Sequence, residues 1–128
     1  MERIAKRVLL VEDEDNIALA LGLLIGRLGY EMQRARTGQE AIRALQTDTP
    51  DLVVLDVMLA QGSGYEVCQF IRENNALSDV KVLMMSAGGK MAQRKGLALG
   101  ADAFFVKPFD TKLMMQAIRD LLDGRACA

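Results

Sequence analysis

The sequence predicts an α/β fold in which helices cover both faces of a five-stranded parallel sheet. Short apolar runs alternate with longer segments of helical periodicity, so that a strand is followed by a helix five times along the chain. This alternation favours a doubly wound parallel sheet, because each parallel strand needs a crossover helix. The 128 residues, 51% apolar and 26% charged, suffice for one domain with a buried core. We expect a single domain over residues 1–128, with its core at about 6–123.

The first half of the chain is expected to hold three strands and two helices. Val8–Val11 and Leu52–Leu55 are uninterrupted apolar runs, typical of strands buried on both faces. Gly29 ends the first helical segment, and Thr37 can cap the second, with Glu40 completing a capping box. The predicted elements are strand 8–11, helix 16–28, strand 31–35, helix 37–45 and strand 52–55.

The second half continues the alternation. Val67, Phe70 and Ile71 fall on one face of a helical segment, and Val80–Met85 is another apolar run. Asp110 can cap the last helix. The predicted elements are helix 65–73, strand 80–85, helix 91–99, strand 103–106 and helix 111–122.

Composition argues against several classes of protein. Sixteen basic and seventeen acidic residues nearly cancel, so we expect no direct contact with nucleic acid. There is no histidine, and Cys68 and Cys127 lie far apart, which argues against zinc and suits thiols in a reducing cytosol. No apolar run approaches the ~20 residues of a membrane helix, and the run before Glu12 is too short for a signal peptide. We expect a cytoplasmic protein without a membrane partner.

An acidic, hydroxyl or basic residue directly follows four of the five predicted strands. Glu12 and Asp13 follow the first strand, Asp56 the third, Ser86 the fourth and Lys107 the fifth. In a doubly wound sheet these carboxyl ends open on one edge, where such folds bind ligands. Residues more than ninety positions apart are therefore expected to share one site.

The chemistry of that edge points to a metal ion and a phosphoryl group. Carboxylates as close as Glu12, Asp13 and Asp56 repel one another unless a cation lies between them, and oxygen ligands favour Mg²⁺. An aspartate such as Asp56 can be a nucleophile that forms an acyl phosphate. Lys107 would offer a positive charge to the phosphoryl oxygens, and Ser86 a hydroxyl donor.

Each of these residues also has a simpler interpretation when it is taken alone. Glu12 and Asp13 would suit the N-terminus of a helix, where negative charge is favourable. Asp56 could cap a turn or helix, Ser86 could lie in an ordinary loop, and Lys107 could be a solvated surface lysine. Their joint placement at four strand ends favours one shared site.

Four segments of the chain match a known family: Val8–Glu14, Leu52–Leu59, Met85–Ala87 and Gly100–Phe109. They resemble the receiver domain of two-component response regulators. The resemblance covers about residues 6–123, and its four motifs occur in the family's order. It implies a flavodoxin-like sheet with strand order 2-1-3-4-5 and five helices.

The resemblance implies the roles of the site residues. Asp56 would accept phosphate from a phosphohistidine of a sensor histidine kinase or histidine phosphotransfer protein. Glu12, Asp13, Asp56 and the backbone carbonyl of Met58 would hold Mg²⁺. Ser86 and Lys107 would contact the phosphoryl group, and the Lys107–Pro108 peptide bond would be cis.

The resemblance also implies an output. Ser86 and Phe104 would form the switch, which changes the face built from helix 91–99, strand 103–106 and helix 111–122. A downstream effector or output domain would read this face, which is also the expected contact in a homodimer. Ala60 stands where the family usually has proline, so we expect a more mobile loop after Asp56.

Three other functions remain as alternatives. A receiver-like interaction module that is never phosphorylated would fit the fold, but the intact set of site residues argues against it. A phosphohydrolase commonly has an acid two residues after its aspartate, where Met58 cannot transfer protons. A flavodoxin-like electron carrier would not place acidic residues beside an FMN phosphate. We expect no enzyme activity beyond the domain's own phosphorylation and dephosphorylation, in a stand-alone receiver or a piece of a longer regulator.

Overall fold

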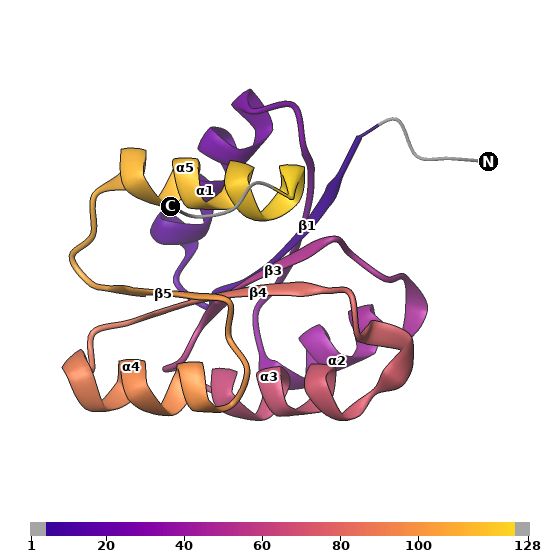
Figure 1. Cartoon of the computed structure of the whole chain (residues 1–128). Helices are drawn as coiled ribbons and strands as arrows, with labels where there is room; N and C mark the ends of the chain where they lie inside the picture. The colour runs from indigo at the N-terminus through magenta and orange to yellow at the C-terminus, as the bar shows by residue number, and fades with distance from the viewer. Residues whose placement is uncertain (1–4, 125–128) are drawn as a thin grey trace.

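Five parallel strands form one sheet in the order β2-β1-β3-β4-β5 (Figure 1). The computed structural model describes residues 5–124, so Cys127 and both ends of the predicted domain lie outside the described residues. The strands are β1 Arg7–Val11, β2 Glu31–Ala35, β3 Leu52–Asp56, β4 Lys81–Ser86 and β5 Ala103–Val106. The helices are α1 Asp15–Arg27, α2 Gly38–Thr47, α3 Gly64–Glu73, α4 Gly89–Ala98 and α5 Thr111–Asp123, with a 3₁₀ turn at Asn75–Leu77. The predicted fold class and strand order are confirmed.

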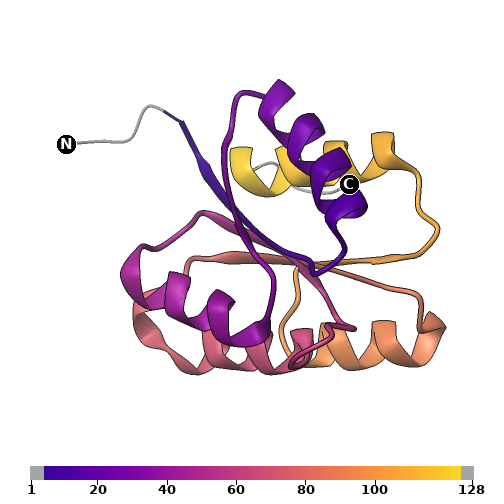
Figure 2. The same ribbon diagram turned by 180° about the vertical axis from the view of Figure 1, so that it is seen from behind.

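The helices cover the two faces of the sheet. Helices α1 and α5 lie on one face, and α2, α3 and α4 lie on the other, as both views show (Figures 1 and 2). Alternate residues of β1 divide between the two cores: Val8 and Leu10 pack with α1 and α5, and Leu9 and Val11 pack under α2 and α3. No helix within residues 5–124 is long and apolar enough to cross a membrane.

Burial along the strands explains the apolar runs of the sequence. Every residue of β3 is buried, as are four of the five residues of β1 and five of the six residues of β4. The edge strands β2 and β5 are more exposed, which accounts for the weaker apolar pattern of β2. The uninterrupted runs therefore mark the three central strands, as expected for a parallel sheet with both faces covered.

The register of the strands brings the polar residues to one level. Asp56 pairs with Met85, and Ser86, the next residue on β4, pairs with Val106. Lys107 follows Val106 and donates its backbone N–H to the Ser86 carbonyl at 2.8 Å. The ends of β3, β4 and β5 are thus adjacent. Asp56 and Ser86, the last residues of β3 and β4, and Lys107, the residue after β5, therefore share one edge.

Helix caps agree with the sequence in part. Thr37 accepts from the Glu40 N–H at 3.1 Å, but the Glu40 carboxylate accepts from the Arg36 N–H at 2.7 Å rather than from Thr37. Asp110 caps α5 by accepting from the Lys112 N–H at 2.8 Å. The Thr37 cap of α2 is confirmed. The prediction that Glu40 completes a capping box is wrong, because the Glu40 carboxylate binds the N–H of the residue before Thr37.

Gly64 at the start of α3 lets that helix approach the end of β3. A Cβ atom at this position would lie 2.4 Å from the Asp56 carbonyl oxygen and 2.9 Å from the Val57 Cα. Both are backbone atoms, so a side chain could be accommodated only by moving the segment that carries Asp56. The close contact also makes the Gly64 N–H donate to the Val57 carbonyl at 2.9 Å.

Replacing Gly64 with alanine should destabilise the domain by about 2–3 kcal/mol, because the new methyl group overlaps backbone. Gly26→Ala is the matched control, since Gly26 lies exposed in α1 and a methyl group there would meet no atom within 4 Å. That control should gain about 0.5–1 kcal/mol from helix propensity. Urea unfolding measures both values. Equal stability of the two variants would show that Gly64 does not enforce the close approach.

Candidate functional site

Three carboxylates converge at the carboxyl ends of β1 and β3. Oxygens of Glu12, Asp13 and Asp56, which we call the carboxylate cluster, lie within 4.8 Å of one another. Glu12 is 1% exposed and Asp56 is 4% exposed, whereas Asp13 is half-buried. The sequence predicted this convergence. Burial makes the mutual repulsion of these charges much stronger than it would be in water.

Lys107 supplies the opposing charge. Its ammonium group lies 2.8 Å from Asp56 Oδ2 and 3.6 Å from Glu12 Oε1. Burial alone would lower the pKa of Lys107, but the hydrogen bond and attraction to Asp56, together with the charge of Glu12, outweigh burial and raise this pKa. Lys107 therefore remains protonated at neutral pH and offsets one of the negative charges.

Glu12 is the buried carboxylate of the cluster whose charge is less well compensated, since Lys107 lies closer to Asp56. Its Oε2 accepts from the Glu14 N–H at 3.1 Å, but Oε1 is buried with no hydrogen-bond partner among residues 5–124. Burial is the main cause that raises the pKa of Glu12 to about 7, and the charge of Asp56 raises it further. A buried acceptor without a donor is costly, and a cation would satisfy it.

Both aspartates of the cluster are tied to the loop that follows β3. Asp56 Oδ1 accepts from the Met58 N–H at 3.0 Å, and Asp13 Oδ2 accepts from the Ala60 N–H at 2.8 Å. Proline at position 60 would lack that N–H. The sequence predicted a more mobile loop because of Ala60, but the structure gives Ala60 a hydrogen bond that proline could not make.

Ser86 and Phe104 lie beside this edge. Ser86 is buried, and its Oγ accepts from the Gly88 N–H at 3.0 Å. Phe104 packs in the core beneath α3 and α4, and a methyl group on Gly96 would lie 2.9 Å from its ring. Phe105 packs on the opposite face of the sheet, as the alternation of a strand predicts. The switch roles of Ser86 and Phe104 remain predictions.

The donor set of the carboxylate cluster fits a hard divalent cation. Three carboxylates offer oxygen ligands, and Glu12 Oε1 is a buried oxygen without a donor. Mg²⁺ prefers oxygen ligands of this kind and is commonly bound by one or two carboxylates with waters. The backbone carbonyl of Met58 remains a predicted ligand of the cation.

The Lys107–Pro108 peptide bond is cis, as the resemblance implies.

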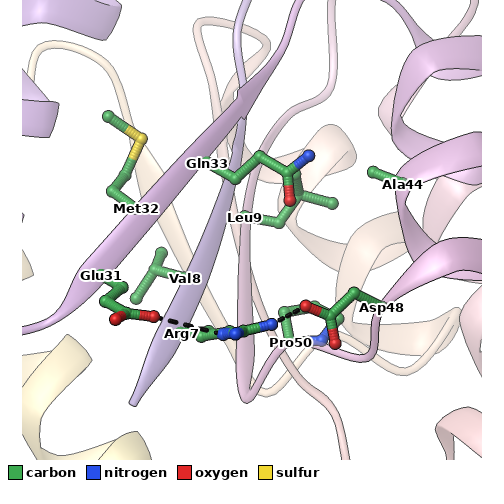
Figure 3. A pocket seen from close by; sticks show the side chains of 9 residues that line it. All are labelled: Arg7, Val8, Leu9, Glu31, Met32, Gln33, Ala44, Asp48 and Pro50. Carbon is green, nitrogen blue, oxygen red and sulfur yellow. Dashed lines mark hydrogen bonds and ion pairs between the residues drawn. The ribbon is translucent and has the colours of Figure 1, made fainter. Parts of the chain in front are cut away.

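A separate cavity of about 200 Å³ lies at the opposite end of the sheet (Figure 3). The Arg7 guanidinium lies between Glu31, at 3.2 Å, and Asp48, and forms ion pairs with both. These residues lie at the amino ends of β1 and β2 and just after α2. The cavity therefore does not include the carboxylate cluster, whose charged edge is the better candidate site.

The sequence did not single out Arg34, which the structure places against this site. Its guanidinium donates from Nε and Nη2 to the backbone carbonyl of Glu12. The available signal was an arginine near the end of β2, a strand expected to lie next to the acidic pair. That signal is weak, because most arginines on edge strands are solvated.

The metal-free domain should lose stability as pH rises from about 4.5 to 7. Glu12 loses its proton near pH 4.5 when the chain is unfolded but keeps it to about pH 7 when folded, so unfolding in this range releases a proton. The free energy of unfolding should fall by roughly 1–3 kcal/mol across the range. Glu12→Gln should flatten the curve measured by urea unfolding. The same slope in wild type and variant would contradict a protonated Glu12.

Comparison with known proteins places these features in a family. The family model of the response regulator receiver domain matches residues 8–119. The chain is 43% identical over 123 residues to the probable transcriptional regulator ycf27 of Cyanophora paradoxa, covering 95% of the chain and 50% of that relative. It is 36% identical over 118 residues to the alkaline phosphatase synthesis transcriptional regulatory protein PhoP of Bacillus subtilis (strain 168), covering 91% and 48%. The chain thus spans about half the length of the curated relatives it matches.

Solved structures agree with this assignment. A putative response regulator from Chloroflexus aurantiacus superposes with a TM-score of 0.87 at 30% identity, covering 93% of this chain and 98% of that one. The response regulator protein TrrA from Thermotoga maritima, in complex with Mg²⁺ and BeF, gives a TM-score of 0.81 at 32% identity, covering 91% and 99%. The predicted family is confirmed: this chain belongs to the receiver domains of two-component response regulators.

Proposed function

We propose that Asp56 is the phosphoacceptor and that the carboxylate cluster holds Mg²⁺, together with the backbone carbonyl of Met58. The phosphoryl group comes from a phosphohistidine of a sensor histidine kinase or histidine phosphotransfer protein. The observation that carries this proposal is the Lys107 ammonium, 2.8 Å from Asp56 Oδ2 within a buried group of carboxylates. The TrrA structure, a complex with Mg²⁺ and BeF, adds support from a relative.

The residues around Asp56 suit an aspartate nucleophile. Transfer forms a P–O bond to an Asp56 oxygen as the P–N bond to histidine breaks, and the histidine leaves with its bonding electrons. Mg²⁺, when bound, would offset the negative charge of the phosphoryl oxygens. Hydrogen bonds from Lys107 and from the Met58 N–H fix the direction of the Asp56 carboxylate.

Lys107 and Ser86 are placed to contact the phosphoryl group. Lys107 remains charged because its pKa is raised, and an ammonium group can move from a carboxylate oxygen to a phosphoryl oxygen without losing its charge. Ser86 Oγ accepts from Gly88 and keeps its own hydrogen free to donate. We assign Ser86 and Phe104 as the switch.

The output surface is the face built from α4, β5 and α5. Gly96 is the one buried residue of α4, and no side chain caps the N-terminus of this helix. Helix α4 is therefore weakly anchored to the rest of the domain. Exposed apolar side chains gather on these three elements: Met91, Leu97, Val106 and Leu113. We place here the contact with a downstream effector or output domain, and the contact between two copies in a homodimer.

The domain acts as a cytoplasmic signal carrier rather than as an enzyme with a separate substrate. Met58 lies two residues after Asp56 and is 71% exposed. A thioether cannot donate or accept the proton that turnover of an acyl phosphate would need. Met58 therefore offers no general acid or base for rapid hydrolysis, and we assign to the domain the phosphorylation of Asp56 and its slow dephosphorylation.

Treatment with acetyl phosphate and Mg²⁺ should add one phosphoryl group to the wild-type chain, detected by intact-mass spectrometry. Asp56→Asn should abolish the addition, because an amide is not a nucleophile of this kind. Asp79→Asn, which changes an exposed aspartate in the turn before β4, should leave it unchanged. No addition to the wild type, or addition that survives in Asp56→Asn, would sink the proposal and favour an interaction module that is never phosphorylated.

A further inference from the structure

Arg34 of β2 contacts the turn that carries the acidic pair of the site. We propose that Arg34 is a positioning residue that orients Glu12 and Asp13 for Mg²⁺, an inference that rests on the proposed function. Arg34 has no carboxylate oxygen to offer a cation, so it acts through the backbone that it holds. We call residues 12–15 the acidic turn.

Arg34 holds the acidic turn at two points. Its Nε and Nη2 donate to the Glu12 carbonyl oxygen at 3.1 and 3.0 Å, and its Nη1 donates to Asp15 Oδ1 at 2.8 Å. The side chain is only 23% exposed. The hydrogen bond from Arg34 is also the main cause that lowers the pKa of Asp15, so Asp15 is a carboxylate at neutral pH. The planar guanidinium thereby spans the turn from its first residue to its last.

The Glu12 carbonyl is the point at which the chain leaves the sheet. The N–H of Glu12 still donates to the Ala35 carbonyl at 3.0 Å, which continues the ladder between β1 and β2. Strand β2 ends at Ala35, so it offers no further backbone N–H to the Glu12 carbonyl. The guanidinium of Arg34 donates to that carbonyl instead. Partly buried carbonyls usually have a hydrogen-bond partner, and Arg34 is the side chain that supplies it here.

This carbonyl belongs to the peptide plane that joins Glu12 to Asp13. Because the peptide unit is rigid and planar, hydrogen bonds to its oxygen restrict the rotation of the whole plane. The directions in which the two side chains leave the backbone are then set with respect to each other. Outer contacts that orient metal ligands typically change metal affinity by about 10–100-fold.

Arg36 provides a control with the same charge. Its Nη2 also lies 2.8 Å from Asp15 Oδ1, but its side chain is 55% exposed, and it makes no contact with Glu12 among the described interactions of residues 5–124. Removing either arginine takes away one positive charge near the carboxylate cluster. Charge alone predicts that both removals strengthen Mg²⁺ binding. Positioning predicts the opposite result for Arg34 only.

The test is an Mg²⁺ titration of the unphosphorylated full chain, followed by ¹H–¹⁵N NMR. We expect Arg34→Met to weaken Mg²⁺ binding about tenfold relative to wild type, and Arg36→Met to bind Mg²⁺ as tightly as wild type or more tightly. Arg34→Lys keeps the charge but has no planar fork, so it should fall between wild type and Arg34→Met. If Arg34→Met does not fold, the Arg34→Lys comparison with Arg36→Met decides the matter by itself.

A kinetic readout separates positioning from general loss of structure. In the acetyl phosphate reaction, the Mg²⁺ concentration for half-maximal rate should rise for the Arg34 variants, whereas the rate at saturating Mg²⁺ should stay within about threefold of wild type. Mg²⁺ affinity unchanged in Arg34→Met, or weakened equally in Arg36→Met, would overturn the inference and leave the proposed function intact. Failure of the wild type to bind Mg²⁺ would overturn both.

Discussion

The buried pair of Glu12 and Asp56 is the constraint on which the rest of the site depends. Two carboxylates at the end of a sheet, each less than 5% exposed, cannot both be charged without compensation. Lys107 compensates one of them, at 2.8 Å from Asp56. Glu12 remains, with an Oε1 that lies 3.6 Å from Lys107 but has no hydrogen bond within residues 5–124, and with its pKa raised to about 7. The buried Glu12 carboxylate can therefore be neutralised either by a proton or by a cation, and its place in the carboxylate cluster suits a divalent cation.

The fold creates this constraint from segments that are far apart in the sequence. A parallel sheet aligns the ends of its strands, and the observed register places Asp56, Ser86 and Lys107 at neighbouring positions. Gly64 then brings α3 against the backbone that carries Asp56. The loops that follow β1 and β3 are joined by the hydrogen bond from Ala60 to Asp13. The site is thus held by backbone geometry more than by its own charges, which favour separation.

The features that were predictable from the sequence are those set by periodicity. Apolar runs locate the central strands, and the parallel topology then requires the residues after them to meet at one edge. Side-chain contacts were not predictable in this way. Arg34 reaches the Glu12 carbonyl from another strand, and the Ala60 N–H finds Asp13 across 47 positions. Such contacts depend on rotamers and loop geometry, which apolar periodicity does not report. The 3₁₀ turn at Asn75–Leu77 lies in a loop and was not predicted for the same reason.

The most direct measurement of the central constraint is a ¹³C NMR titration of the Glu12 side-chain carboxyl with and without Mg²⁺. Without metal, the pKa of Glu12 should lie near 7, because the carboxyl is buried beside Asp56. With saturating Mg²⁺, the pKa should fall below the ordinary glutamate value of 4.5, since the cation favours the charged form. A pKa that is ordinary without metal, or one that Mg²⁺ does not change, would contradict the account.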